Sequence, residues 1–379
     1  MSRLDELIQE YCPNGVEYKE LQSILKIKNG SDYKSFGEGN VPVYGSGGIM
    51  AYIDHFAYDK PSVLIPRKGS IDKLYYVDTP FWNVDTIFYT EINTELVIPR
   101  YVYHCLLREH LEKLNTAGGV PSLTQKVLNH VKIPVPPLPV QSEIVRILDN
   151  FTELTAELTA ELTARKKQYE YYRDRLLHLD GERITIQELF DTRNGFTPSK
   201  DNPEFWENGD LPWFKIDDIN NKGRILSESY LHITPKALKK SGLFPENSII
   251  ISTSATIGEY ALITVPFLCN QRFTCMTVKP IYKDKVNIKY LMHYCPMLSK
   301  YCKEHLNQGN FASVDMKQFA KFEFVIPPIE EQQRIVAILD RFDTLCNDLS
   351  YGLPAEIEAR QKQYEYYRDK LLSFKEMSV

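Results

Sequence analysis

The sequence predicts an α+β fold: two similar mixed α/β domains separated by two long antiparallel helices, arranged as a pseudo-twofold internal repeat. Two pairs of matching segments support this prediction. PPLPVQSEIVRILDNF at Pro136 returns as PPIEEQQRIVAILDRF at Pro327, with nine identities in sixteen positions. RKKQYEYYRDRLL at Arg165 returns as RQKQYEYYRDKLL at Arg360, with eleven identities in thirteen. A spacing near 190 residues is too long for a solenoid, so each copy is a whole domain followed by a helix.

The expected order of elements follows from these matches. The first mixed α/β domain covers 1–140 and the second covers 183–330, because both alternate short β-rich runs with Gly- and Pro-containing turns. Helices are expected over 141–182 and 331–379. The two domains share the landmarks Ser62–Pro66 with Ser248–Ser252, Pro80-Phe81 with Pro266-Phe267, and Asn83 with Asn270. Outside these landmarks the domains diverge, which fits two binding modules that read different things.

Each expected helix carries a long apolar seam. The seam residues that we expect to join the helices, or to dock other subunits, are Phe151, Leu158, Leu162, Tyr169, Tyr172, Phe342, Ile357, Tyr364 and Tyr367. An intramolecular coiled coil would bury both seams, whereas either helix alone would leave an apolar face in water. Two alternatives stay open. Each seam could pack only on its own domain, and the tyrosines could form a docking surface instead of a clamp between helices.

The spacing between the matched segments differs by four residues, because the two offsets are 191 and 195. The first copy contains the tandem unit TAEL, at Thr155–Leu158 and again at Thr159–Leu162. The second copy has Gly352 and Pro354 in this stretch. Proline is tolerated in a first helical turn but not in a helix interior, so we expect a break near Gly352 and a restart at Pro354.

Composition excludes several classes of protein. The hydrophobic content of 43% predicts a folded chain, and a net charge of −5 does not by itself indicate a nucleic-acid binder. Seven cysteines without a CxxC pair predict reduced thiols, and the spacing of His293, Cys295, Cys302 and His305 matches no zinc pattern, so no metal is expected. No run of about 18 apolar residues and no secretory leader is present. We therefore expect a cytoplasmic protein without a membrane partner.

No catalytic constellation is apparent, so no catalytic residue and no cofactor bound by this chain are expected. The sequence lacks GxxxxGK[ST], GxGxxG and the Asn/Asp-Pro-Pro-aromatic tetrad. Asp217-Asp218 and Asp72-Lys73 are isolated charged positions rather than a magnesium site, and such residues are usually solvated surface.

The remaining candidates are loops rich in small, basic and hydrogen-bonding side chains. Asn and Gln can pair with adenine and Arg with guanine, while Ser, Thr and Lys suit base-edge or phosphate contacts. The candidate DNA-binding residues are Tyr44, Ser46, Arg67, Lys68, Ser70, Ser252, Thr253, Ser254, Asn270, Gln271 and Arg272.

The tandem TAEL units, the echo of IPVPPLPVQSEIVRILD in VIPPIEEQQRIVAILD, and the doubled KQYEYYRD tail resemble a type I restriction-modification specificity subunit of the TAEL-repeat kind. The resemblance covers the whole chain. It implies two target-recognition domains that each read one half of a split, asymmetric site in double-stranded DNA, with the helices setting their separation.

The resemblance further implies partners and cofactors that the residues alone do not reveal. Two modification subunits would bring S-adenosylmethionine and methylate adenine, and restriction subunits would bring ATP-driven translocation and cleavage, with Mg²⁺ on these partners. Two other classes are weighed against this one: a fused enzyme with an unrecognised catalytic site, and a coiled-coil scaffold with two protein-binding domains.

Overall fold

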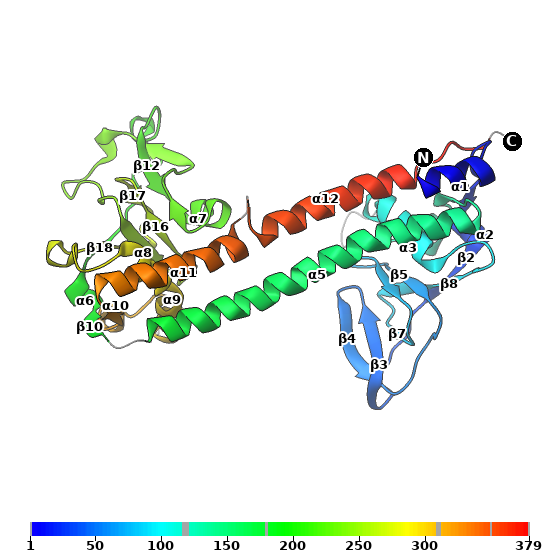
Figure 1. Ribbon diagram of the computed structural model, residues 1–379, viewed down its shortest axis with the longest axis horizontal. Helices are drawn as coiled ribbons and strands as arrows, with labels where there is room; N and C mark the ends of the chain where they lie inside the picture. The colour runs from blue at the N-terminus through cyan, green and yellow to red at the C-terminus, as the bar shows by residue number, and fades with distance from the viewer. Residues whose placement is uncertain (1, 116–120, 179–180, 308–311, 349–350, 378–379) are drawn as a thin grey trace. The chain divides into compact units, whose positions relative to one another are not determined.

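The structure is a computed structural model that describes residues 2–115, 121–178, 181–307, 312–348 and 351–377. The chain forms two compact units (Figure 1). Unit 1 comprises Met1–Leu158 and Ile357–Val379, and unit 2 comprises Thr159–Glu356. Both sequence repeats therefore contribute to each unit: unit 1 takes most of its chain from the first repeat and its last segment from the second.

Unit 1 is built on a four-stranded sheet with the order β2-β8-β5-β6, a three-stranded sheet with the order β4-β3-β7, and the pair β1-β9. Its strands are β1 (Tyr18–Glu20), β2 (Leu25–Asn29), β3 (Glu38–Gly45), β4 (Gly48–Ile53), β5 (Ser62–Pro66), β6 (Tyr75–Val77), β7 (Trp82–Asn83), β8 (Ile87–Ile92) and β9 (Lys132–Pro134). Its shorter helices are α1 (Arg3–Tyr11), α2 (Leu21–Ile24), α3 (Pro99–Arg108) and α4 (Gln125–Asn129). All five residues of β5 are buried, because this strand lies between two others and contacts α3.

Unit 2 repeats this plan with a five-stranded sheet, β11-β18-β15-β16-β13, a three-stranded sheet, β14-β12-β17, and the pair β10-β19. Its strands are β10 (Glu182–Thr185), β11 (Phe190–Asn194), β12 (Leu211–Phe214), β13 (Ile225–Leu226), β14 (Leu231–Ile233), β15 (Ser248–Ser252), β16 (Tyr260–Ile263), β17 (Leu268–Cys269), β18 (Phe273–Val278) and β19 (Glu323–Ile326). Its shorter helices are α6 (Ile186–Leu189), α7 (Ile216–Lys222), α8 (Ile288–His293), α9 (Cys295–Glu304) and α10 (Met316–Phe319).

The strand registers relate the two domains residue by residue. Pro66 pairs with Ile87 in unit 1, and Ser252 pairs with Phe273 in unit 2, which gives an offset of 186 on both strands. In the three-stranded sheets, Asn83 of β7 pairs with β3 and Cys269 of β17 pairs with β12, both in parallel. Asn83 therefore corresponds to Cys269, again with an offset of 186 residues. The expected match of Asn83 with Asn270 is therefore wrong by one residue, since the shared Asn does not occupy the same place on the strand.

Three long helices complete the units: α5 (Leu138–Leu177), α11 (Ile329–Asn347) and α12 (Leu353–Leu371). α5 begins in unit 1 and ends in unit 2. The predicted break in the second helix is confirmed, because α11 ends before Gly352 and α12 begins after it. The second helix restarts at Leu353, one residue before the expected Pro354. Gly352 is required there, since a Cβ atom at this position would lie 2.6 Å from the Thr344 carbonyl oxygen.

Within each unit the long helices run antiparallel (Figure 1), and the aromatic side chains of their seams are in contact. In unit 1, Phe151 of α5 stacks on Tyr367 of α12 with ring centroids 5.3 Å apart. In unit 2, Phe342 of α11 packs against Tyr172 and Tyr169 of α5, with centroids 5.7 and 6.3 Å apart. The other seam residues, Leu158, Leu162 and Ile357, are half-buried.

A buried glutamine fixes the start of each long helix to its domain. In unit 1 the Gln141 side chain accepts a hydrogen bond from the amide of Ile98 (2.8 Å) and donates to the carbonyls of Leu96 (2.9 Å) and Pro136 (2.7 Å). Gln332 repeats this arrangement in unit 2 with Asn287, Lys285 and Pro327, each at 2.8 Å. Both glutamines lie five residues after the first proline of the repeated segment, so the identity of these segments has a structural cause.

A buried histidine joins the two long helices of each unit. His104 contacts Asp149 of α5 through Nε2 (2.9 Å) and Tyr364 of α12 through Nδ1 (2.9 Å). In unit 2, His293 contacts Asp340 of α11 (3.0 Å) and Tyr169 of α5 (3.3 Å) in the same way. Tyr364 and Tyr169 are equivalent in the sequence repeat. Each domain therefore bonds the tyrosine from the other repeat.

Candidate nucleic-acid interface

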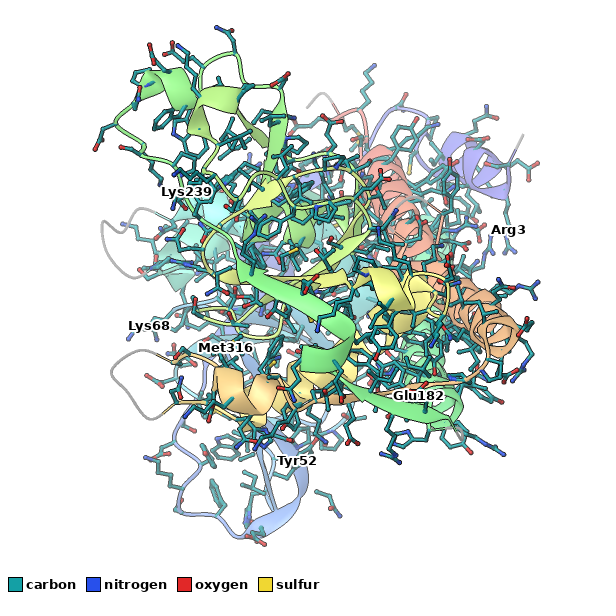
Figure 2. All side chains as sticks on the ribbon, turned by 90° about the vertical axis from the view of Figure 1, so that its left-hand side faces the viewer. Arg3, Tyr52, Lys68, Glu182, Lys239 and Met316 are labelled. Carbon is teal, nitrogen blue, oxygen red and sulfur yellow. The ribbon has the colours of Figure 1, made fainter. Side chains whose placement is uncertain are left out.

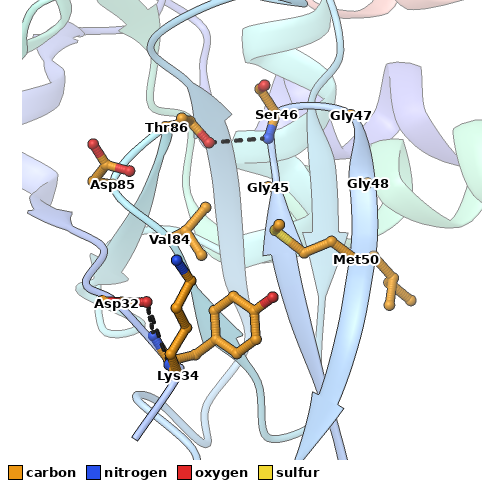
Figure 3. A pocket seen from close by; sticks show the side chains of 12 residues that line it. Asp32, Lys34, Gly45, Ser46, Gly47, Gly48, Met50, Val84, Asp85 and Thr86 are labelled. Carbon is orange, nitrogen blue, oxygen red and sulfur yellow. Dashed lines mark hydrogen bonds between the residues drawn. The ribbon is translucent and has the colours of Figure 1, made fainter.

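Unit 1 has a surface cavity of about 830 Å³ beside the β3–β4 hairpin (Figure 3). Three segments enclose it: the turn after β2, the hairpin itself, and the loop between β7 and β8. The polar side chains that line it are Asp32, Tyr33, Lys34, Ser46, Asp85 and Thr86, and the apolar ones are Ile49, Met50 and Val84. The Thr86 hydroxyl accepts a hydrogen bond from the Ser46 amide (3.4 Å), which ties the loop to the hairpin. Figure 3 shows Met50 pointing from β4 toward Val84.

Unit 2 has a cavity of about 550 Å³ at the corresponding place. Trp206 and Trp213 form its apolar wall, with ring centroids 5.2 Å apart. Each indole is held by a hydrogen bond to a backbone carbonyl, from Trp206 to Ser199 (2.9 Å) and from Trp213 to Phe196 (3.0 Å). The polar lining residues are Thr197, Lys200, Lys215, Asn270, Gln271 and Arg272.

A close backbone contact lies beside both cavities, against the loop that forms part of each wall. Gly30 follows β2 and Gly195 follows β11, and a Cβ atom at either would lie within 2.4 Å of a carbonyl oxygen of the loop opposite. Only glycine permits this approach. Both glycines belong to an Asn-Gly pair after a basic residue, Lys28-Asn29-Gly30 and Arg193-Asn194-Gly195. This repeated pair is the sequence signal that could have located the cavities, and it was missed.

The candidates of unit 1 divide between the cavity and the core. Ser46 lines the cavity. The loop that contains Lys68 and Ser70 lies against it, because a Cβ atom built on Gly69 of this loop would be 3.4 Å from the Ser46 hydroxyl oxygen. Lys68 is exposed at the surface (Figure 2), and Ser70 is half-buried. Tyr44 instead packs in a small core against the rings of Phe81 and Tyr75.

Arg67 is more constrained than a free surface cation. Its guanidinium lies over the ring of Phe88, 5.1 Å from the centroid, and Nη1 donates to Asn29 Oδ1 at 3.4 Å. Its Nε is buried and has no hydrogen-bond partner within the described part of the chain. A buried donor without a partner is unfavourable, so this placement of the Arg67 side chain lowers the stability of the folded state.

The candidates of unit 2 also divide. Ser252 and Thr253 are buried, and their hydroxyls bond the Ser254 carbonyl (2.9 Å) and the Thr274 hydroxyl (3.0 Å). Ser254 is half-buried and forms a β-bridge with Ser313. Asn270, Gln271 and Arg272 are the candidates that line the cavity. The last two are exposed.

The two cavities differ in charge although their frames agree. Cavity 1, in unit 1, presents Asp32 and Asp85 beside Lys34. Cavity 2, in unit 2, presents Lys200, Lys215 and Arg272. Lys215 also forms an ion pair with Asp217 (2.6 Å), and this hydrogen bond raises the pKa of Lys215. The same fold therefore offers acceptor-rich chemistry in one unit and donor-rich chemistry in the other.

All seven cysteines are buried, and His293 and His305, which flank two of them in the sequence, have structural partners. Burial raises the pKa of Cys275 and of Cys302 to about 12, so neither is a reactive thiolate at neutral pH. His293 belongs to the helix network, and His305 stacks on Tyr301 with centroids 4.0 Å apart. Among the residues with described positions, no group of three or more His, Cys, Asp or Glu side chains is arranged to hold a metal ion. Over the same residues, no helix is long and apolar enough to cross a bilayer.

Two copies of one α/β module, each with a cavity at the same topological place but with a different lining, define a class of protein with two distinct recognition sites. The model of the type I restriction modification DNA specificity domain matches residues 13–165 and again 180–359. The chain belongs to this family. Its members are the specificity subunits of type I restriction enzymes, which are not themselves catalytic.

Individual relatives support this assignment. The specificity subunit of the Escherichia coli type I restriction enzyme EcoR124I/EcoR124II is 42% identical, over 99% of this chain and 97% of that protein. The specificity subunit of the E. coli enzyme EcoprrI is 50% identical over 205 residues, and that match spans about half of each protein, 52% of this chain and 51% of the relative. The crystal structure of a type I specificity subunit from M. genitalium shares the fold, with a TM-score of 0.60 at 14% identity over 94% and 96% of the two chains.

Proposed function

We propose that this chain binds a bipartite, asymmetric site in double-stranded DNA, with one half-site read by each domain. The observation that supports this most strongly is the pair of equivalent cavities with different linings, cavity 1 and cavity 2. Identical modules with identical linings would fit a symmetric site. Different donors and acceptors at the same place in each frame instead fit two different base sequences.

The candidate contacts sort into reading and positioning groups. Ser46, Asn270, Gln271 and Arg272 line the cavities and are proposed to face base edges. Lys68 and Arg67 sit on the adjoining loop and are proposed to bind phosphates, which fix register without reading sequence. The buried Ser252 and Thr253 hydroxyls and the packed ring of Tyr44 support these loops from behind.

The chain is proposed to act through partner subunits, with two modification subunits methylating adenine and restriction subunits cleaving DNA. S-adenosylmethionine, ATP and Mg²⁺ are assigned to those partners. A repeated exposed surface supports the docking of two copies of one partner. Tyr171 and Tyr366 are equivalent in the repeat, and they are 59% and 62% exposed. Large aromatic side chains at interfaces supply much of the binding energy.

A domain exchange tests the two-reader proposal. Residues 1–135 are replaced by the same region of a related specificity subunit, and methylated adenines are mapped in a host that carries the modification subunits but no restriction subunit. One half-site should change while the other keeps its sequence. Exchange of the second domain is the matched control and should change only the other half. A simultaneous change of both half-sites would contradict the proposal.

The docking surface has its own test. Tyr171→Ala and Tyr366→Ala should each weaken the binding of one modification subunit, and the double variant should weaken both, as measured by native mass spectrometry of the assembled complex. Tyr351→Ala is the control, because Tyr351 is 91% exposed but has no counterpart in the repeat. An unchanged stoichiometry and affinity in the double variant would move the docking surface elsewhere.

A further inference from the structure

The loop between the last strand of the three-stranded sheet and the next strand has the same backbone frame in both units. The amide of Val84 donates to the Tyr44 carbonyl, and that of Asn270 to the Phe214 carbonyl, both at 3.0 Å. At the other end of the loop, the carbonyls of Thr86 and Arg272 accept from the amides of Arg67 and Thr253, both at 2.9 Å. Val84-Asp85-Thr86 is therefore equivalent to Asn270-Gln271-Arg272, residue for residue.

The two tripeptides carry different hydrogen-bonding groups on this shared frame: unit 1 has Asp85 where unit 2 has Gln271, and unit 2 has Arg272 where unit 1 has Thr86. Asp85 is exposed on the wall of cavity 1, and its carboxylate only accepts hydrogen bonds. Gln271 and Arg272 are exposed on the wall of cavity 2, and the guanidinium only donates. In the described part of the chain, the Arg272 side chain has no hydrogen bond or ion pair, whereas Gln271 accepts from the Thr197 hydroxyl.

The sign of the charge at Asp85 limits what it can face. A carboxylate at a DNA surface repels phosphates, so it is unfavourable as a positioning contact. It is useful where an amino group must be distinguished from a carbonyl, since the cytosine N4 amino group donates into the major groove and a carboxylate accepts it. A group that binds one base and repels the alternatives provides selectivity by both attraction and repulsion.

We infer that these two tripeptides are base-reading elements, with Asp85 selecting cytosine in the half-site of unit 1 and Arg272 selecting guanine in the half-site of unit 2. The inference rests on the proposed function of the two cavities and adds the base that each reads. Arg272 pairs with guanine through O6 and N7, the acceptors that guanine presents in the major groove. Lys200 on the same wall adds a positive field that favours this acceptor-rich edge.

Two single substitutions test the assignment in the full chain, assembled with its modification subunits in cells without the restriction subunit. Methylated sites are mapped for Arg272→Gln and Asp85→Asn. Arg272→Gln should lower the preference for guanine at one position of one half-site by about 5- to 140-fold, in favour of adenine, which Gln pairs with. Asp85→Asn should lower the preference for cytosine at one position of the other half-site by a similar factor, because the Asn amide group donates hydrogen bonds as well as accepting them. Lys283→Gln, an exposed cation at the opposite end of β18, should leave the motif unchanged.

Affinity measurements cover the case in which a variant no longer methylates. Purified complexes are titrated with duplexes that carry each of the four base pairs at each half-site position. A loss confined to one base pair at one position supports the inference, whereas an equal loss for all sequences would make the residue a phosphate contact and overturn it. An unchanged motif in both variants would also overturn it. A wild-type complex that yields no bipartite motif would instead contradict the proposed function itself.

Discussion

Tyr364→Phe should destabilise unit 1 by removing one hydroxyl group from the buried network that joins its long helices. His104 is fully buried, and its Nδ1 lies 2.9 Å from the Tyr364 hydroxyl. Burial raises the pKa of Tyr364, so the hydroxyl stays protonated and can donate to this nitrogen. Burial alone would raise the pKa of Asp149, but hydrogen bonds from His104 and Arg100 lower it overall, so Asp149 is the carboxylate that accepts from Nε2. The network is satisfied by a neutral imidazole.

Loss of the hydroxyl leaves a buried acceptor without a partner, which lowers the free energy of unfolding by about 1–3 kcal/mol. Native-state hydrogen exchange followed by mass spectrometry measures this loss of stability for unit 1 alone. Amides of α12 that exchange only when unit 1 unfolds should exchange roughly 5- to 140-fold faster in the variant. Tyr366→Phe is the control, because Tyr366 is 62% exposed on the same helix. In a His104→Leu background, Tyr364→Phe should have little further effect. Equal effects of Tyr364→Phe and Tyr366→Phe would refute the reasoning.

Three further outcomes are expected. Burial lowers the pKa of His104 below its reference value of 6.5. As the pH falls below about 6.5, His104 therefore binds a proton in the unfolded chain before it does so in the folded chain, and unit 1 should lose stability. His104→Asn should remove this part of the slope in exchange measurements between pH 7.5 and 5.5. Gln332→Ala leaves three backbone groups without partners and should destabilise unit 2 by ~3 kcal/mol or more in urea titrations, while Gln333→Ala on the exposed face should not. Insertion of one TAEL unit after Leu162 adds ~6 Å of helix and should lengthen the unread spacer by one base pair in methylation maps, with both half-sites unchanged.

Sequence repeats predicted the helices because the same physical demands recur in both copies. Gln141 and Gln332 must each satisfy three backbone groups at the start of a helix, so the segment around them is preserved. The break in the second helix was also predictable, since Gly352 and Pro354 act on the local backbone. The sequence reveals these features because each leaves a mark in a short segment of the chain, either a repeated motif or a Gly and a Pro close together.

The partner of each tyrosine could not be predicted in this way. Tyr169 and Tyr364 lie in nearly identical segments, so no local pattern says which of them bonds His104 and which bonds His293. Only the tertiary arrangement decides, and it pairs each histidine with the tyrosine of the other repeat. Part of each cavity wall was also missed for a related reason: Asp85 and Trp206 belong to loops whose sequences differ between the copies.

The division of the chain into units imposes an order on its folding. Unit 2 is one continuous stretch, Thr159–Glu356, whereas unit 1 needs Ile357–Val379 to complete the core that already holds residues up to 158. Leu372 is fully buried in that core, and the amide of Val16 donates to the Lys375 carbonyl at 2.9 Å. During synthesis, the domain that leaves the ribosome first therefore waits for almost 200 further residues before its last helix arrives. In the interval the side chains that pack on Leu372 stay open to solvent, whereas the second domain, which is continuous in the chain, can complete its core as soon as it is synthesised.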